Sequence, residues 1–156
     1  NQFYRTEADE LTYPFHVLIR YKIEKMLFNK EIKVSEISDT FNNLFFEYFG
    51  TKPSNKSEGC YQDVHWSSGF AYFPTYVLGS AISAQILNSM EKDFNPFLDM
   101  KKGEFMRVNE WLKEHVHKYG ASKTNKEVIK LATNEEFNPK YYIDYLKDKF
   151  SKIYNL

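Results

Sequence analysis

The sequence is poor in cysteine, glycine and proline. Cys60 is the single cysteine among 156 residues, and there are only 6 glycines and 5 prolines. One cysteine cannot form a disulfide within the chain, which fits a reducing compartment. The opening residues, NQFYRTEADE, include acids and have no apolar core, so they do not resemble a signal peptide. We therefore expect a cytoplasmic protein, and the scarcity of turn residues argues against a β-rich fold.

The sequence also lacks an excess of charge of either sign. Lysine and arginine together number 21, as do aspartate and glutamate, so the formal net charge is zero. No basic surplus is present to attract a nucleic acid or an anionic membrane, and we expect neither as a partner. A stretch without charged residues lies between Asp63 and Glu91, but Ser80, Gln85 and Asn88 interrupt its apolar run. A buried helix is therefore predicted there rather than a membrane span.

Apolar residues recur at helical spacing through most of the chain, and no segment alternates as a strand would. Aromatic residues are frequent, at 18%. The length is sufficient for one domain with a sizeable core. We predict an all-α fold, with residues 1–156 forming a single helical domain of about six helices. The segments expected to be helical are 6–29, 34–49, 74–92, 105–119, 125–133 and 139–154.

Several helix ends have local signals. Thr6 and the acids after it are expected to begin the first helix, and Pro14 is expected to bend it or to set a late first turn. Gly50 is a left-handed stop for the second helix, and Thr124 with Glu127 predicts a capping box. The helix over 74–92 is apolar on both sides, so we expect it to be the most buried. Its inward stripe is expected to be Leu78, Ala81, Ile82 and Gln85.

An aromatic segment, Gly59 to Tyr76, leads into that helix with the sequence GCYQDVHWSSGFAYFPTY. Seven of its eighteen residues are Tyr, Phe, Trp or His. The pattern alone favours a well-packed buried loop, and a binding or catalytic wall is the alternative. An extended backbone would place Asp63 and His65 on one side, where the carboxylate would fix the imidazole tautomer and the histidine would be able to donate to an oxyanion. The phenols of Tyr72 and Tyr76 follow at helical spacing and are further candidate donors.

The common catalytic motifs HExxH, CxxC, P-loop and GxSxG are absent from the sequence. The other histidines, His16, His115 and His117, are interpreted as structural or surface residues, and the last two lie two positions apart on a helix, so they cannot share a metal. Arg5 precedes a helix with an acidic first turn. From the sequence alone we favour an ion pair with an acid of that turn over an anion clamp. The acids in reach are Glu7, Asp9 and Glu10.

Two blocks of the sequence are specific enough to carry a resemblance. The first is RTEADELTYPFH, from Arg5 to His16, and the second is GCYQDVHW, from Gly59 to Trp66. They resemble the blocks (I)RxxADELTYPLH and GxxQDxHW of the thermostable carboxypeptidase family, the Taq-type metallocarboxypeptidases. Tyr4 stands where the family has an aliphatic residue. The resemblance covers essentially the whole chain, but only the C-terminal part of the family.

Members of this family are several hundred residues long and mostly helical, with HExxH and a further glutamate as metal ligands. The resemblance implies that this chain is the C-terminal part of a zinc-dependent metallocarboxypeptidase, which removes C-terminal amino acids from peptides. The zinc ligands would lie outside this chain, which alone would bind no zinc and be inactive. Its partners would be the C-terminus of a peptide, the N-terminal part of the same protein and, in the full-length parent, a second copy in a homodimer. The missing initiator methionine leads us to expect an excised or processed piece.

The resemblance also implies roles for residues of the aromatic segment. His65 would donate to the tetrahedral oxyanion, and Asp63 would orient it. Tyr72 or Tyr76 would assist, and the sequence does not choose between them.

Substrate binding is the other implied role. Arg5 would hold the terminal carboxylate of the substrate, and Gln62 would contribute to binding. Two alternatives stay open beside the peptidase. One is a non-enzymatic helical module that binds a partner in an aromatic groove, and the other is a purely structural domain.

Overall fold

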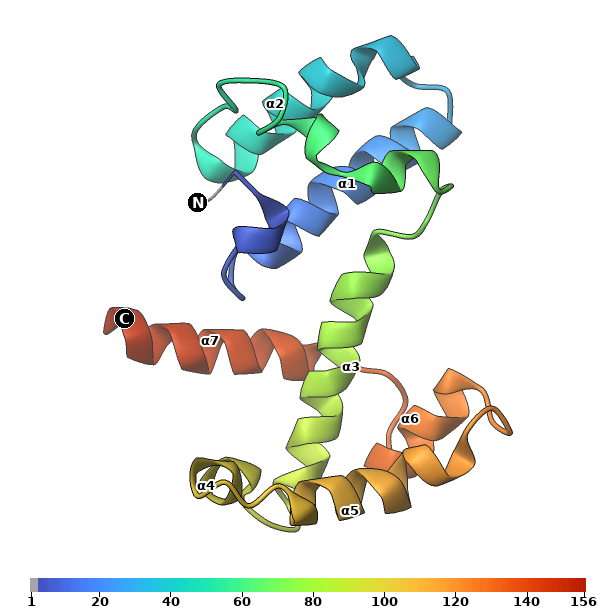
Figure 1. Cartoon of the computed structure of the whole chain (residues 1–156), viewed down its shortest axis with the longest axis vertical. Helices are drawn as coiled ribbons and strands as arrows, with labels where there is room; N and C mark the ends of the chain where they lie inside the picture. Colours follow the sequence, from blue (N-terminus) through green and yellow to red (C-terminus); the bar gives the residue numbers. More distant parts are fainter. Residues whose placement is uncertain (1–2) are drawn as a thin grey trace. The chain divides into compact units, whose positions relative to one another are not determined.

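The structure is a computed structural model that describes residues 3–156. Over these residues the chain is helical and has no strands (Figure 1). The α-helices are α1 (Tyr13–Phe28), α2 (Ile37–Phe49), α3 (Pro74–Met90), α4 (Pro96–Lys101), α5 (Met106–His115), α6 (Asn125–Thr133) and α7 (Lys140–Tyr154). Short 3-10 turns are η1 (Arg5–Glu7), η2 (Val34–Glu36), η3 (Cys60–Gln62), η4 (Val64–Ser67) and η5 (His117–Tyr119). The prediction of an all-α fold is confirmed.

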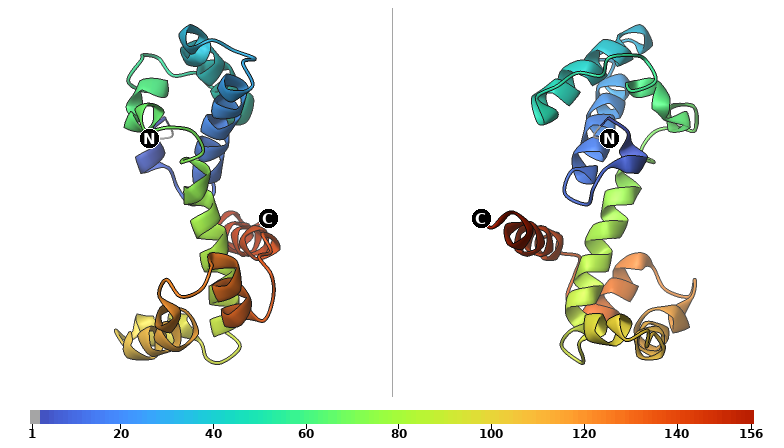
Figure 2. Two further views of the ribbon diagram at one scale, coloured as in Figure 1. Left: turned by 90° about the vertical axis from the view of Figure 1, so that its right-hand side faces the viewer. Right: turned by 60° about the vertical axis from the view of Figure 1, so that its left-hand side comes forward.

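The chain divides into two compact units, Asn1–Leu78 and Gly79–Leu156. In the first unit α1 and α2 lie side by side, and η3 contacts α2 (Figure 2). In the second unit α5 contacts both α4 and α6. The boundary between the units falls within α3, and the expectation of a single domain over 1–156 stays a prediction. Among the described helices, none combines the length and the apolar character that crossing a membrane requires.

The core of the first unit forms where α1, α2 and η3 meet. Its buried members are spaced four apart on α1 and three to four apart on α2, so each helix turns one apolar stripe inward. They are Ile19, Ile23, Phe41, Leu44, Phe45 and Cys60. Fully burying a side chain of the size of isoleucine or phenylalanine stabilises a fold by about 1.5–3 kcal/mol. Through Cys60, this core fixes the start of the aromatic segment against α1 and α2.

The second unit has a buried amide near its centre. Gln85 donates to the hydroxyl of Thr133 and to the carbonyl of Glu136, both at 3.0 Å. It also accepts from the backbone N–H of Asn138 at 2.9 Å. One side chain of α3 therefore holds the loop that joins α6 to α7.

Helix α1 begins later than the sequence suggested. The side chain of Asp9 accepts hydrogen bonds from the backbone N–H groups of Leu11 and Thr12, at 2.9 and 2.8 Å. These bonds close a turn before the helix. The helix starts at Tyr13 with Pro14 in its first turn, where the missing N–H breaks no helical hydrogen bond. The predicted start near Thr6 is wrong, and the late first turn that was one of the two outcomes expected from Pro14 is correct.

Other helix ends follow their local signals. Gly50 ends α2 in the left-handed conformation, with φ of +69°. Thr124 and Glu127 form both hydrogen bonds of the capping box that begins α6. The last helix was predicted to begin at Pro139 and begins one residue later: Pro139 is the N-cap of α7, and Asn138 before it accepts from the backbone N–H of Lys140 at 3.0 Å. The segment predicted as one helix over 105–119 divides into α5 and η5.

Two expectations about the helices are wrong. Helix α3 is not the most buried, because Leu78 of its predicted inward stripe is 47% exposed. Helix α1 instead buries more of its residues, and three of them are polar: His16, Arg20 and Glu24. The short helix α4 was also not predicted, since the residues between 92 and 105 were expected to form no helix, whereas Pro96 begins one.

Candidate active site

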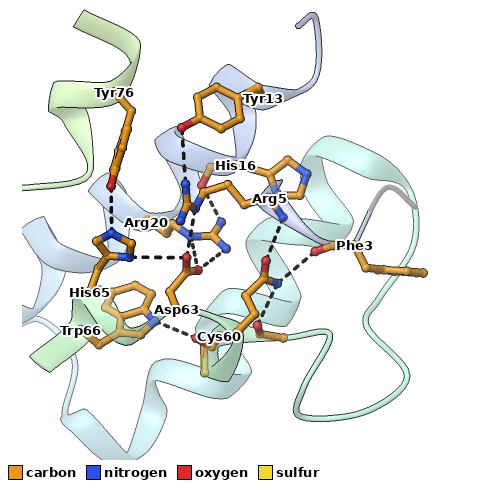
Figure 3. A network of polar contacts seen from close by, with 12 residues as sticks. Phe3, Arg5, Tyr13, His16, Arg20, Cys60, Asp63, His65, Trp66 and Tyr76 are labelled. Atoms are coloured by element: carbon orange, nitrogen blue, oxygen red, sulfur yellow. Dashed lines mark hydrogen bonds and ion pairs between the residues drawn. The ribbon is translucent and has the colours of Figure 1, made fainter. Parts of the chain in front are cut away.

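The polar cluster of the first unit is centred on Asp63, which lies between η3 and η4 and is buried (Figure 3). One carboxylate oxygen, Oδ1, accepts from Nε of Arg5 at 3.0 Å. The other, Oδ2, accepts from Nε of Arg20 at 2.6 Å and also contacts Nη2 of the same guanidinium. Asp63 therefore binds one arginine with each oxygen, and it joins the segment before α1, helix α1 itself and the aromatic segment.

Arg20 is the inner of the two arginines, and its side chain has no exposed surface. Its Nη1 donates to the backbone carbonyl of His16 at 2.7 Å, and its guanidinium lies 5.2 Å from the ring centre of Phe41 and 5.8 Å from that of Phe73. Burial lowers the pKa of Arg20, and the charge and hydrogen bond of Asp63 oppose that shift. The sequence did not single out Arg20. The signal that it offered was an arginine four residues after His16 on the helix face that also carries Ile23.

Arg5 is the outer arginine, with 11% of its side chain exposed. Its Nη1 donates to the hydroxyl of Tyr13 at 3.4 Å, and its guanidinium lies 5.2 Å from the ring centre of Tyr76. Burial disfavours its charged form, but the hydrogen bond and charge of Asp63 outweigh burial and raise the pKa of Arg5. The favoured prediction, an ion pair of Arg5 with an acid of the following turn, is wrong. Its ionic partner is Asp63, because η1 turns Arg5 toward the aromatic segment.

His65 lies beside the same carboxylate oxygen as Arg5. Its Nδ1 is 3.8 Å from Oδ1 of Asp63, and its Nε2 shares a hydrogen bond of 2.9 Å with the hydroxyl of Tyr76. The predicted extended backbone is wrong in part: Asp63 is extended, whereas His65 lies in the 3-10 turn η4. The two side chains nevertheless come together, at an ion-pair distance that is too long for a hydrogen bond.

The two tyrosines of the site contact His65 in different ways. Tyr76 bonds to the imidazole, and Tyr72 stacks on it with ring centres 5.5 Å apart. Burial and the hydrogen bond with Tyr72 raise the pKa of Tyr76. Tyr72 is half exposed, at 51%. The geometry therefore distinguishes the two phenols, which the sequence did not.

Gln62 and Trp66 fix the backbone of the aromatic segment. The Gln62 amide accepts from the backbone N–H of Arg5 at 2.8 Å and donates to the carbonyls of Phe3, Glu58 and Gly59 at 2.9–3.1 Å. Gln62 thus holds the segment that carries Arg5, and a direct contact with substrate stays a prediction. The indole N–H of Trp66 donates to the carbonyl of Cys60 at 2.7 Å. Cys60 is only 3% exposed, and burial raises the pKa of its thiol.

The charges of the cluster do not cancel. Arg5 and Arg20 bring two positive charges and Asp63 brings one negative charge, so one positive charge remains, apart from His65. Within the part of the chain that the structure describes, the polar contacts of Arg5 use Nε and Nη1, which leaves Nη2 for a ligand. A guanidinium with spare donors and a surplus positive charge is suited to bind a carboxylate.

The cluster is not suited to hold a metal. Both oxygens of Asp63 face arginines, and among residues 3–156 no three side chains of His, Cys, Asp or Glu come together as metal ligands. The donor set of this cluster therefore does not fit a metal ion.

Residues 1–150 match the family described as carboxypeptidase Taq (M32) metallopeptidase. The chain thus belongs to this family, as its two sequence blocks predicted. It is 45% identical over 156 residues to carboxypeptidase 1 of Bacillus subtilis, covering 99% of this chain and 31% of that protein. It is 37% identical over 150 residues to thermostable carboxypeptidase 1 of Pyrococcus furiosus, covering 95% of this chain and 30% of that protein.

The fold agrees with this assignment. The crystal structure of the M32 carboxypeptidase from Deinococcus radiodurans R1 superposes with a TM-score of 0.92 at 31% identity, covering 99% of this chain and 32% of that one. The chain therefore spans about a third of the length of the relatives that it matches.

Proposed function

We propose that this chain is the C-terminal, substrate-facing part of a zinc-dependent carboxypeptidase. The observation that carries the proposal is the convergence of Arg5 and His65, far apart in the sequence, on one oxygen of Asp63, at 3.0 and 3.8 Å. Membership of the metallopeptidase family supports it. The zinc, its ligands and a homodimer of the full-length parent are further parts of the proposal, and they rest on the family resemblance. A cytoplasmic location is also part of it and rests on the single cysteine, which fits a reducing compartment.

In this proposal Arg5 binds the C-terminal carboxylate of the peptide. A guanidinium presents its donors in a planar fork that matches a carboxylate, and such charge-assisted pairs are about twice as strong as neutral hydrogen bonds. Asp63 and Tyr13 hold Nε and Nη1, so the direction of the remaining donors is fixed before the substrate arrives. An enzyme with this clamp would recognise the end of a peptide, which is the property that defines a carboxypeptidase.

His65 and Tyr76 form the donor pair in this proposal. They share one hydrogen bond, in which one group donates to the other. In this proposal the reacting carbonyl oxygen would replace one partner of that bond and accept from the imidazole Nε2–H or from the phenol. A donor aimed at the oxyanion stabilises the tetrahedral intermediate, and removal of one such donor costs roughly a hundred- to thousandfold in rate. Tyr72 stacks on the imidazole and would limit its rotation.

Two experiments test the proposal. The first compares binding of an N-acetylated dipeptide with a free carboxylate and of its C-terminal amide to this chain, by two-dimensional NMR. We expect the acid to bind and the amide not to bind, and the Arg5→Gln variant to lose the difference. Equal binding of acid and amide would contradict the role of Arg5.

The second experiment tests catalysis in carboxypeptidase 1 of Bacillus subtilis, with its 156 aligned residues replaced by this chain. We expect His65→Gln to lower kcat for a blocked dipeptide by about a hundredfold or more, and the matched control His117→Gln to leave it unchanged. This chain alone is expected to have no peptidase activity and no tightly bound zinc.

The structural alternative has one observation in its favour, the fully buried pair of Asp63 and Arg20. A purely structural or non-enzymatic module predicts that His65→Gln lowers the free energy of unfolding and changes turnover only to that extent. Lost turnover with an unchanged unfolding transition would exclude it.

A further inference from the structure

We propose that Arg20 is a positioning residue that neutralises Asp63 and thereby keeps the charge of Arg5 available to the carboxylate of the substrate. This inference rests on the proposed function, because it concerns the same anion site. Arg20 itself does not touch the substrate, since its side chain is completely buried.

Arg20 is held from several sides, so it is a fixed charge. Its Nη1 donates to a main-chain carbonyl of its own helix, and two aromatic rings lie against the guanidinium. Its Nε and Nη2 both contact Oδ2 of Asp63, which turns the other oxygen, Oδ1, toward Arg5 and His65. The two oxygens of the carboxylate therefore have different partners: Oδ2 binds the buried Arg20, and Oδ1 faces Arg5 and His65.

This pairing of Arg20 with Asp63 determines how much positive charge Arg5 presents to a ligand. With Arg20 present, the three groups carry one net positive charge, and it is on Arg5 that this charge is accessible. Without Arg20, the negative charge of Asp63 would neutralise Arg5 alone. Oδ2 of Asp63, no longer bound to Arg20, would be able to turn toward the guanidinium of Arg5. The clamp would become a neutral ion pair. At the effective dielectric of a partly exposed site, the loss of one nearby charge lowers anion affinity by on the order of tenfold to a hundredfold.

The test measures the dissociation constant of this chain for the N-acetylated dipeptide acid, with the C-terminal amide as the reference ligand. We expect Arg20→Met to weaken binding of the acid at least tenfold, whereas Arg20→Lys, which keeps the charge, retains most of the affinity. The decisive variant is Arg20→Met combined with Asp63→Asn. It removes one charge of each sign, so Arg5 again carries the net positive charge, and we expect affinity within about threefold of the wild type.

The double variant separates charge from support. If Arg20 only supported the fold, restoring the charge balance would not restore binding, and a double variant that folds but binds as weakly as Arg5→Gln would overturn the inference. Binding of Arg20→Met equal to that of the wild type would overturn it as well. Should Arg20→Met fail to fold, as judged by circular dichroism, the double variant carries the test. A wild-type chain that does not distinguish acid from amide would instead contradict the proposed function, and this inference would fall with it.

Discussion

Asp63→Asn is the change whose effect on stability follows most directly from the structure. Arg20 is 0% exposed and Asp63 is 2% exposed at the side chain, so the substitution leaves a buried guanidinium without its counter-ion. Breaking a buried ion pair on one side costs about 3–5 kcal/mol. Asparagine is nearly isosteric with aspartate, so no cavity adds to this figure. The matched control is Asp148→Asn, which breaks the pair with Lys152, where both side chains are mostly exposed (67% and 73%). That change is expected to cost about 0.5 kcal/mol or less.

Urea unfolding monitored by circular dichroism measures both variants. Linear extrapolation gives the free energy of unfolding in water, and equal slopes show that the same surface is exposed in each variant. For a unit of this size, each 1 kcal/mol lowers the melting temperature by roughly 4–8 °C, so Asp63→Asn is expected to lose at least about 12 °C. A loss of less than about 1 kcal/mol would refute the reasoning, because it would mean that Arg20 does not depend on Asp63 for its charge.

Three further predictions, which cover four substitutions, rest on local features of the structure. Burial raises the pKa of Glu24 above its ordinary value of 4.5, so the folded chain keeps that proton to a higher pH than the unfolded chain, and the resulting stability is lost as the pH rises through the folded pKa. We expect Glu24→Gln to remove this decline, with a growing advantage over the wild type above pH 4.5 in unfolding curves taken at several pH values. Ala71 has φ of +68°, which favours glycine, so Ala71→Gly is expected to stabilise by about 0.5–1 kcal/mol, whereas Gly50→Ala, at φ of +69°, is expected to destabilise by about 1 kcal/mol. Thr124→Ala removes the capping box of α6 and is expected to cost about 1 kcal/mol.

Each of these three predictions has an outcome that contradicts it. For Glu24, it is a variant whose unfolding free energy parallels that of the wild type at every pH. For the two left-handed positions, it is a shift of the same sign for both substitutions. For Thr124, it is an unfolding curve that superposes on that of the wild type.

Features that depend on neighbouring residues in the chain were predicted well. The stop at Gly50 and the capping box at Thr124 need only a few adjacent residues, and the structure has both. The start of α1 was harder, because the acids after Thr6 looked like the first turn of a helix. Asp9 instead closes a separate turn, and the helix begins only at Tyr13.

The site was predicted only as far as its motifs reached. His65, Asp63 and Arg5 were candidates from their local sequence patterns, the two sequence blocks strengthened them, and the structure brings them together. The predicted partner of Arg5 was wrong. Nearness in sequence favoured the acids beside it, whereas the fold brings in the carboxylate of Asp63, 58 positions away. Arg20 was missed for a related reason. An arginine on a helix is normally exposed. Arg20 is buried because Asp63 compensates its charge, and that pairing could not be read from the sequence.

The environment of Cys60 makes the opening of the first unit measurable without an introduced cysteine. The thiol is covered by core side chains, its pKa is raised, and the carbonyl of the same residue anchors the Trp66 indole next to His65. A thiolate is needed for alkylation, so a reagent such as iodoacetamide reacts only when this part of the chain opens to water. The alkylation rate thus reports how often the wall of the site opens, and because the sequence has no second cysteine, the signal comes from a single place.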